Sequence, residues 1–246
     1  MTSASPPPPP PPFGPSFGPS FGVLYEDNHL LIVDKPAELP TMGVTAGTPS
    51  LIEEAKEYVR RKYDKPGNVY LGIVSRLDAP VTGVVVIART SKAAKRLTEQ
   101  FRDKRVEKRY LALVSPPPAA PRGNCVDWLR KDERHRKVFV TRAGADGARE
   151  AKLSYRTLHA ARERALLEVL LETGRKHQIR VQLSALGCPV VGDHKYGSTL
   201  SFPLGIALHS HRLKLEHPVR REPLVVTAPL PASWGKVRSW AKSDER

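Results

Sequence analysis

The sequence predicts an α+β protein built on a mixed, mainly antiparallel β-sheet with helices packed against it. Strand-like runs outnumber helical runs, and the two kinds do not alternate strictly, as they would in a doubly wound parallel sheet. Several strand-like runs are separated only by short polar turns, which is typical of antiparallel hairpins. With 246 residues, 40% of them hydrophobic, the chain is long enough to bury a substantial core.

The first 22 residues have a composition that does not support a packed core. A run of prolines is followed by a short repeat built on Phe-Gly-Pro-Ser. Such segments offer few side chains to bury and stay extended or disordered. We therefore predict a disordered, proline-rich tail over residues 1–22 and a folded domain over residues 23–246.

The first half of the domain combines two helices with several strands. Residues 23–36 predict two strands around a turn at Asp27-Asn28. Ser50 and Glu53 form a capping box at the start of a helix. The further elements are a helix over 50–63, a buried strand over 83–90, a helix over 91–106 capped by Ser91, and a strand over 107–115.

The second half begins with a proline-rich connector over residues 115–123. Residues 150–160 and 164–173 both have the pattern of strands, and the charged residues 162–164 lie between them. We therefore predict a hairpin at this turn.

A helix is predicted over residues 174–187. Ile179, Leu183 and Leu186 share one face at helical spacing, and Gly187 is suited to end the helix. The chain then closes with a strand over 223–230 and a short helix over 232–241 that Gly235 interrupts.

Charge is the strongest compositional signal. Lysine and arginine number 40 against 25 acidic residues, which gives a formal net charge of +15 and a pI of about 10.0. Such an excess indicates a polyanionic partner, with nucleic acid as the first expectation and an anionic membrane surface as the second.

Three features favour a cytoplasmic protein without a structural metal. Cys125 and Cys188 are the only cysteines and form no CxxC pair, so neither a disulfide framework nor a zinc site is expected. No apolar run approaches the roughly 18 residues needed to span a bilayer. The N-terminus also lacks the pattern of a secretory signal. We predict a cytoplasmic location and no membrane association.

One carboxylate stands just before a run of valines. Asp78 lies in the segment SRLDAPVTG, directly ahead of the strand predicted from residue 83. A surface turn is one interpretation, because Asp-x-Pro is common in loops. The other is a catalytic carboxylate on a rigid element, which needs a cationic partner to stay ionised when partly buried.

Candidate partners follow in the segment GRKHQIR. Polar side chains crowd into two turns of the predicted helix, namely those of Arg175, His177, Gln178 and Arg180. His177 and Arg180 are three residues apart and therefore share a helix face. An ordinary solvated basic face has the same pattern, and spacing alone does not separate the two interpretations.

Two further groups of side chains also have more than one interpretation. Tyr110 is expected to be half-buried in its strand, with its hydroxyl reaching a cleft, although core packing is the commoner role of a strand tyrosine. His209, His211 and His217 suggest a zinc site. We disfavour that interpretation, because no cysteine or acidic ligand stands at metal spacing nearby.

Five segments, taken in order, resemble the successive motifs of the RluA-type pseudouridine synthases. They are YEDNHLLIVDKPAELP, SRLDAPVTGVVVIART, KRYLALV, GRKHQIRVQLSALGCPVVGDHKYG and LHSHRLKLEHP. The resemblance covers about residues 23–230. It implies a pseudouridine synthase-like fold with a central cleft, in a compact member of the family without an S4 domain.

The resemblance also implies roles for individual residues. Asp78 matches the catalytic aspartate, and Arg180 matches the basic residue that pairs with it. Tyr110 matches the tyrosine that packs against the target base and is implicated in proton removal. Arg76 matches the arginine that fills the gap left by the departing nucleotide. The residues expected to contact RNA are Arg76, Arg175, His177, Gln178 and Lys108.

Two positions depart from the family pattern. Ser75 stands where the family usually has histidine, and Val81-Thr82-Gly83 stands in place of Thr-Ser-Gly. Both lie within a few residues of Asp78. The contacts of these side chains therefore bear on how the RNA and the start of the strand are positioned.

The function implied is an isomerase that converts a specific uridine in structured RNA, ribosomal or transfer RNA, to pseudouridine. The reaction involves no redox change or phosphate activation, so no cofactor, nucleotide or metal is expected. A monomer is the simplest expectation. The alternatives are a catalytically inactive RNA-binding module or RNA chaperone, a DNA- or ribosome-associated structural protein, and a metal-dependent hydrolase.

Overall fold

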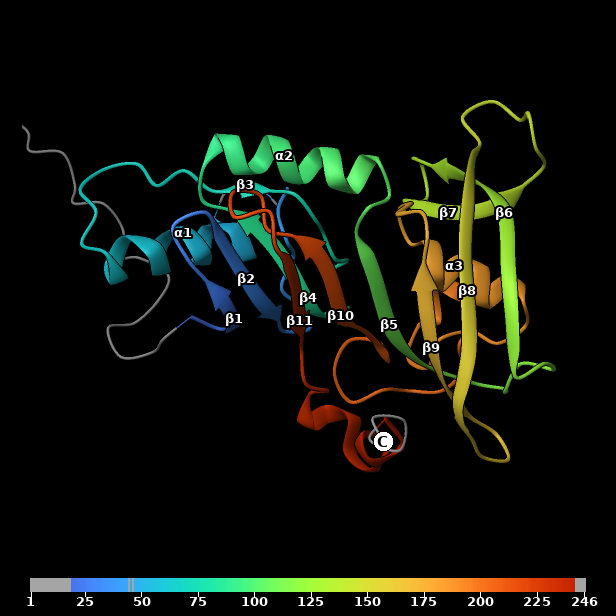
Figure 1. The fold of residues 1–246 in the computed structure, drawn as a ribbon. Coiled ribbons are helices and arrows are strands. Elements are labelled where there is room, and N and C mark those ends of the chain that lie inside the picture. Colours follow the sequence, from blue (N-terminus) through green and yellow to red (C-terminus); the bar gives the residue numbers. More distant parts are fainter. Residues whose placement is uncertain (1–18, 44, 46, 242–246) are drawn as a thin grey trace, which may run out of the picture.

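The computed structural model describes residues 19–43, 45 and 47–241, and the statements below concern these residues (Figure 1). The strands are β1 (Gly22–Glu26), β2 (Leu30–Lys35), β3 (Gly72–Ile73), β4 (Thr82–Ala88), β5 (Glu107–Val114), β6 (Arg122–Asp132), β7 (Lys137–Thr141), β8 (Arg149–Ala160), β9 (Ala165–Leu171), β10 (Leu208–Glu216) and β11 (Pro223–Thr227). The helices are α1 (Leu51–Lys62), α2 (Ser91–Arg102), α3 (Gln178–Ala185) and α4 (Arg238–Ala241), with 3₁₀ helices η1 (His194–Tyr196) and η2 (Ala232–Val237).

All of these strands belong to one sheet. Its order is β1-β2-β4-β10-β5-β9-β8-β6-β7, while β11 also pairs with β10 and β3 with β4. β4 and β10 run parallel, and the other pairs between these strands are antiparallel. The predicted α+β class with a mixed, mainly antiparallel sheet is therefore confirmed.

The two hairpins expected from the sequence are present. β1 and β2 pair around Asp27, whose carboxylate accepts the backbone N–H groups of His29 and Leu30, both at 2.8 Å. β8 and β9 pair around a turn in which the Ala161 N–H donates to the Arg164 carbonyl at 2.8 Å. Such turns determine the register, and the register decides which alternating side chains face the core.

The caps of the first two helices differ from the prediction. Ser50 has the extended angles of a cap before α1, but its side chain makes no capping hydrogen bond. α2 is capped by Thr90 and not by Ser91, because the Thr90 hydroxyl accepts the Ala93 N–H at 3.2 Å. Ser91 is already the first helical residue.

α3 is shorter than predicted at both ends. His177 adopts left-handed angles (φ 54°, ψ 19°), which interrupt a helical path, so the helix starts at Gln178. Arg175 and His177 consequently lie in the loop before α3, and the predicted helical spacing of His177 and Arg180 is wrong. Leu186 is also not part of the buried face, because it lies beyond the helix and is 45% exposed.

No element is predicted between the connector and residue 150, yet β6 and β7 form a hairpin there. Arg122, inside the predicted connector, is already the first residue of β6. Only Leu129 and Val138 are buried in these two strands. The sequence therefore lacks the alternation of apolar and polar residues by which a half-buried strand is predicted. The hairpin is stabilised by a small cluster of Leu129, Val138, Ala151, Val181 and Tyr196, which joins it to β8 and α3.

Residues 1–18 of the predicted tail lie outside the described residues. The last residues of the tail belong to the fold: the Phe21 side chain is buried against α1 and β2, and Gly22 begins β1. The Ser20 hydroxyl donates to the Glu54 carboxylate at 2.5 Å. Residues 20–22, which the prediction assigns to the tail, therefore take part in the fold, because the Phe21 side chain fills an apolar site.

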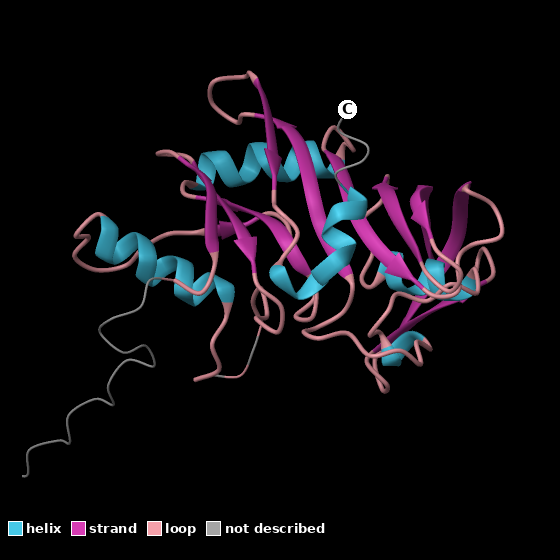
Figure 2. Cartoon of the chain, turned by 90° about the horizontal axis from the view of Figure 1, so that it is seen from below, coloured by secondary structure: helices cyan, strands magenta, loops and turns pink. Residues whose placement is uncertain are grey.

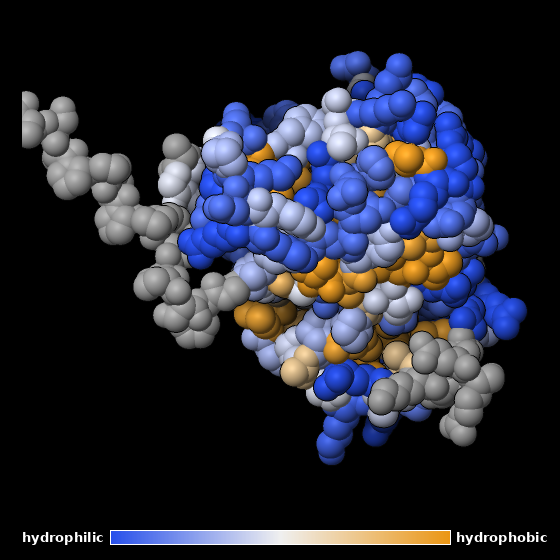
Figure 3. Space-filling model, turned by 60° about the vertical axis from the view of Figure 1, so that its left-hand side comes forward, coloured by the Kyte–Doolittle hydropathy of each residue, from blue (hydrophilic) through white to orange (hydrophobic). Residues whose placement is uncertain are grey.

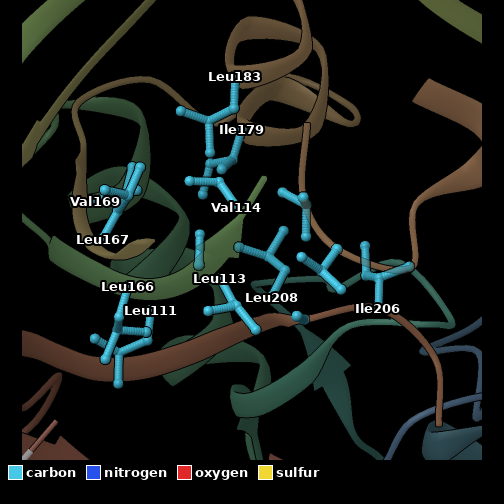
Figure 4. Close-up of a cluster of buried hydrophobic side chains, with 14 of the residues drawn as sticks. Leu111, Leu113, Val114, Leu166, Leu167, Val169, Ile179, Leu183, Ile206 and Leu208 are labelled. Atoms are coloured by element: carbon cyan, nitrogen blue, oxygen red, sulfur yellow. The ribbon is translucent and has the colours of Figure 1, made fainter. Parts of the chain in front are cut away.

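Helices cover both faces of the sheet (Figure 2). α1 packs against the odd-numbered residues of β2 and β4, and α2 against the even-numbered residues on the opposite face. In the other half of the sheet, Ile179 and Leu183 of α3 point toward Val114, Leu167 and Val169 (Figure 4). Burying such a side chain stabilises the fold by about 1.5–3 kcal/mol, so this contact holds α3 firmly on the sheet.

The surface shown in Figure 3 is mostly hydrophilic. Hydrophobic side chains gather in a band across the middle of this face, between hydrophilic regions. A surface rich in charged side chains agrees with the 40 lysines and arginines of the chain, which an apolar core cannot accommodate.

Gly205 holds a loop against the segment that contains Asp78. Its φ of +70° lies in the left-handed region, and a Cβ at this position would be 2.3 Å from the Pro80 carbonyl oxygen. The next residue, Ile206, donates its N–H to the same oxygen at 3.1 Å. Glycine is therefore required both by the backbone angle and by the close approach.

We predict that Gly205→Ala lowers the free energy of unfolding by about 3 kcal/mol, because left-handed strain and the clash with Pro80 add. Gly144→Ala is the matched control, since Gly144 has a φ of +77° and no atom within 4 Å of its Cβ position. That control should cost only about 1 kcal/mol. Urea denaturation measures the free energy of unfolding of both variants. Equal losses of stability would show that the close contact with Pro80 adds nothing to the cost.

Candidate active site

Asp78 lies at the wall of a cavity of about 780 Å³. The cavity is lined by the segment before β4, the end of α2, the start of β5, and the loop between β9 and α3. The side chains of Asp78, Tyr110 and Arg180 all line it, although they are far apart in the sequence. The structure thus brings the three predicted catalytic residues together.

The backbone around Asp78 is irregular but held by side chains. The Thr41 hydroxyl donates to the Leu77 carbonyl at 2.8 Å and accepts the Leu77 N–H at 3.1 Å. On the other side, the Lys35 ammonium donates to the Ala79 carbonyl at 3.0 Å. With polar partners on both flanking residues, the Asp78 carboxylate is held in place by the surrounding fold.

Lys35 is an unusual anchor, because its long cationic side chain is fully buried. Its Nζ donates to three carbonyl oxygens, those of Pro36 at 2.7 Å, Leu39 at 2.8 Å and Ala79 at 3.0 Å. Burial lowers the pKa of Lys35 to about 7, against the opposing effect of the Asp78 charge. The three acceptors use all the hydrogen-bond donors of an ammonium group, so the side chain is fully committed to this turn.

Arg180 lies between two carboxylates. Its Nε and Nη2 donate to the two oxygens of Asp193 at 2.6 and 2.9 Å, and its Nη1 donates to Asp78 Oδ2 at 2.8 Å. Burial alone would lower the pKa of Arg180, but the hydrogen bonds and charges of Asp193 and Asp78 more than offset it and the pKa is raised. A permanent positive charge therefore faces Asp78.

His177 approaches the other oxygen of Asp78. Its Nε2 lies 3.7 Å from Asp78 Oδ1, and its side chain is 9% exposed. Burial lowers the pKa of His177 to about 4, with the Asp78 charge acting in the opposite direction and Arg180 in the same direction. The imidazole is consequently neutral at neutral pH.

Tyr110 lies on β5 and lines the same cavity, half-buried as predicted. Burial raises the pKa of Tyr110 to about 12; a hydrogen bond with the Ser210 side chain acts against this shift, and the Asp78 charge adds to it. The hydroxyl is therefore protonated at neutral pH. The ring offers an aromatic surface beside the carboxylate.

Basic side chains stand on two sides of the cavity. Three of them, Arg102, Lys104 and Lys108, come from the end of α2, the turn after it and the start of β5. The other two, Arg175 and Lys176, come from the loop before α3. Burial lowers the pKa of Lys108, and the charge of Lys104 adds to this shift. Among the residues predicted to contact RNA, those that line the cavity with a basic side chain are Arg76, Arg175 and Lys108.

Gln178, also predicted to contact RNA, is turned inward. Its side chain is buried, and its amide oxygen accepts from the Thr173 hydroxyl and the Arg175 N–H at 2.8 and 2.9 Å. Its amide nitrogen donates to the Lys152 carbonyl at 3.0 Å. The amide is thus used to shape the loop before α3, and this position does not favour contact with RNA.

The two departures from the family pattern have defined contacts. The Ser75 hydroxyl accepts the Val86 N–H at 2.9 Å and so ties the segment before Asp78 to β4. Thr82 Oγ1 and His209 Nδ1 are 2.8 Å apart, and His209 Nε2 is 3.1 Å from the Ala228 carbonyl. Thr82 therefore helps to hold the beginning of β4, and Ser75 bonds to a residue farther along the same strand.

In the part of the chain that the structure describes, no three His, Cys, Asp or Glu side chains gather as a metal-binding group. His209 bonds within the core, and His217 Nε2 lies 2.8 Å from Asp27 Oδ2. Cys125 and Cys188 are free thiols. None of the described helices is both long and apolar enough to cross a membrane.

Four residues of the site were not predicted from the sequence. Lys35 and Thr41 act on the backbone of the Asp78 turn, and Asp193 and Tyr196 act on Arg180 and His177. All but Thr41 lie in the segments that carry the family resemblance. Their roles depend on partners far away in the sequence, which a single sequence does not reveal.

Residues 29–185 match the family of RNA pseudouridylate synthases. The chain belongs to this family. It is 36% identical over 239 residues to the ribosomal large subunit pseudouridine synthase D of Xanthomonas campestris pv. campestris, with 90% of this chain and 70% of that protein covered. The corresponding protein of Xylella fastidiosa is 35% identical over 226 residues, with 85% of this chain and 66% of that protein covered.

A solved structure of the human RNA pseudouridylate synthase domain containing 4 has the same fold. It is 27% identical, with a TM-score of 0.73, and the match covers 88% of this chain and 93% of that one. Pseudouridine synthases are isomerases that act on RNA, so the predicted family, fold, enzyme class and RNA substrate are confirmed. The roles of individual residues stay predictions.

The lowered pKa of His177 predicts a pH dependence of stability. Between the ordinary value of 6.5 and about 4, the folded state binds fewer protons than the unfolded state. The free energy of unfolding is therefore unaffected by the titration of His177 above pH 6.5, and it falls as the pH drops from 6.5 toward 4. His177→Gln should remove this part of the fall. Urea denaturation of both proteins across this range tests it, and parallel curves would contradict it.

Proposed function

We propose that this RNA pseudouridine synthase isomerises a specific uridine in structured ribosomal RNA, with Asp78 as the catalytic carboxylate. One observation carries the proposal. Asp78 is 26% exposed at the cavity wall, with Oδ2 bonded to Arg180. Oδ1 has no hydrogen bond among the described residues and is available to a substrate. Ribosomal RNA is supported by the names of the two bacterial relatives.

The reaction requires a carboxylate but no redox partner. The N1–C1′ bond breaks, the uracil turns and C5 joins C1′, while C5 loses a proton and N1 gains one. A carboxylate can act by attack at C1′, by attack on the base, or by removing a ribose proton to give a glycal. In each course the charge on Asp78 changes, and the adjacent Arg180 guanidinium stabilises its ionised form.

Tyr110 is proposed to pack against the uracil in the cavity. Aromatic rings bind flipped bases by stacking, and this ring lies beside Asp78. Because burial raises its pKa to about 12, Tyr110 is a phenol at neutral pH. It can therefore accept the C5 proton only if its own proton leaves in the same step, and N1 of the uracil, which gains a proton in the reaction, is the group that can take it up.

The target nucleotide must leave its stack to reach Asp78, at a cost of a few kcal/mol. A cavity of about 780 Å³ is large enough for a nucleotide. We propose that exposed Arg76 fills the gap in the RNA and that Lys104, Lys108 and Arg175 bind its phosphates. These contacts supply the binding free energy that offsets the cost of unstacking.

We further propose that residues 20–241 act as one catalytic domain and as a monomer in the cytoplasm, where ribosomal RNA is found. A single sheet runs through these residues, which supports one folding unit. The competing function is an inactive RNA-binding module. It assigns no use to the Asp78 oxygen that faces the cavity, and the experiments below separate the two.

We predict that Asp78→Asn lowers the rate of pseudouridine formation by about ten-thousand-fold or more, because the amide cannot act as a nucleophile or base. Wild type, this variant and the exposed Asp146→Asn are incubated with unmodified large-subunit ribosomal RNA, and pseudouridine is mapped chemically. Asp146→Asn should retain full activity, and all three proteins should bind RNA equally. Activity in Asp78→Asn would contradict the assigned role.

Unmodified transfer RNA in the same assay tests the substrate. The proposal requires pseudouridine at a defined position of ribosomal RNA. Modification of transfer RNA alone would show that the ribosomal assignment is wrong while the enzyme assignment is right. RNA binding by the wild type without modification of either substrate would favour the binding module.

We predict that Lys104→Gln and Arg175→Gln each weaken RNA binding and reduce its salt dependence. Each lost phosphate contact should lower the slope of log K against log salt concentration by about 0.7–0.9. Lys236→Gln is the control, because Lys236 is exposed on η2 and does not line the cavity. Fluorescence anisotropy over a salt series measures the slopes, and equal slopes in all variants would contradict the proposed phosphate contacts.

A further inference from the structure

Tyr196 is buried behind the site, where it contacts both residues that face Asp78. It ends η1, three residues after Asp193, and is 8% exposed. The Arg180 guanidinium lies over its ring, 5.0 Å from the centroid. The His177 ring meets it edge to face, with 5.6 Å between centroids. The proposed roles of Asp78, Tyr110 and Arg180 give this tyrosine no function in the reaction.

The Tyr196 hydroxyl joins the β6–β7 hairpin to the loop before α3. It accepts the Val138 N–H of β7 at 3.0 Å. It also lies 2.6 Å from His177 Nδ1, a short hydrogen bond between a phenol and an imidazole nitrogen. One oxygen atom thus connects a strand that was not predicted with a residue beside Asp78.

The direction of the second bond follows from counting protons. The hydroxyl has a single proton, and Val138 is a donor that needs an oxygen lone pair. Burial raises the pKa of Tyr196, so the proton is present at neutral pH. Among the described residues, His177 Nδ1 is the acceptor within reach of that proton. A proton on Nδ1 would leave a buried phenol O–H without a partner, which costs about 1–3 kcal/mol.

The tautomer of His177 is thereby determined. Nδ1 accepts from Tyr196, so the single proton of the neutral imidazole is on Nε2. Nε2 is the nitrogen that lies 3.7 Å from Asp78 Oδ1. The ring therefore presents an N–H donor, and no lone pair, to the free carboxylate oxygen and to whatever occupies the cavity beside it.

We infer that Tyr196 is a positioning residue that holds His177 as the Nε2–H tautomer and so provides a neutral hydrogen-bond donor next to Asp78. With a nucleotide in the cavity, this donor can bond to Asp78 Oδ1 or to a substrate oxygen in contact with it. The backbone supports the arrangement, because His177 is held in the left-handed region by the same contacts. The catalytic part of the inference rests on the proposed role of Asp78, whereas the tautomer does not.

The tautomer is measured on the full chain without RNA. Long-range ¹H–¹⁵N correlation spectra separate protonated from unprotonated ring nitrogens, and the His177→Gln spectrum assigns the signals. The inference requires a protonated Nε2 and an unprotonated Nδ1 in the wild type, and a mixture of tautomers in Tyr196→Phe. A protonated Nδ1 in the wild type would overturn it. This result is independent of whether the RNA substrate is right.

The role in catalysis is tested by a double-mutant cycle. Tyr196→Phe should lower kcat by the fraction of His177 that leaves the Nε2–H tautomer, about two- to ten-fold, with KM unchanged. In His177→Gln, the amide nitrogen occupies the place of Nε2 and donates without Tyr196. Adding Tyr196→Phe to that variant should therefore change kcat little. An equal loss in both backgrounds, or an unchanged kcat in Tyr196→Phe, would overturn the inference.

Tyr58→Phe is the matched control, since the Tyr58 hydroxyl donates to Glu26 of β1 at 2.8 Å and Tyr58 does not line the cavity. It should retain wild-type kcat, and a loss equal to that of Tyr196→Phe would overturn the inference. If the wild type makes no pseudouridine at all, the proposed function fails, and the spectra still decide the tautomer.

Discussion

The buried ion pair of Arg180 and Asp193 is the interaction on which the site depends. Their side chains are 6% and 1% exposed, and taking such charges out of water costs several kcal/mol for each ion. The cost is offset because the planar guanidinium meets both carboxylate oxygens of Asp193. A further N–H of the same group is then directed at Asp78. The place of the Asp78 carboxylate is thus a consequence of a pair buried beneath it.

A second constraint is that the site is built on irregular backbone. The turn at Asp78 and the loop before α3 lack the repeating hydrogen bonds of a helix or strand, so buried side chains supply them. Lys35 and Thr41 act on the first segment, and Gln178 acts on the second. Loops held in this way combine the freedom to place a side chain with the rigidity that catalysis needs.

Local patterns were sufficient to predict much of the fold, and the structure brings the side chains of Asp78, Tyr110 and Arg180 to one cavity. The hairpins, the valine-rich strand after Asp78 and the helix containing Arg180 all have a clear apolar period or turn chemistry. Patterns failed in two ways. Thr90 caps α2 in place of the neighbouring Ser91, which is a local choice between two adjacent hydroxyls. β6 depends on a tertiary contact: among its residues only Leu129 is buried, and residues 122–129 pair with β8.

The sequence by itself determined the class of the fold and the family, since these follow from short segments whose order and spacing are visible in one chain. It also led to the proposed residues of the site. Only the tertiary structure decided how the site is held. The bond from Tyr196 to His177 and the burial of Lys35 each join residues whose roles are undefined until the chain has folded. Whether a hydrogen bond forms depends on differences of a few tenths of an ångström in the donor–acceptor distance. Such differences are set by the packed core and not by residue spacing along the chain.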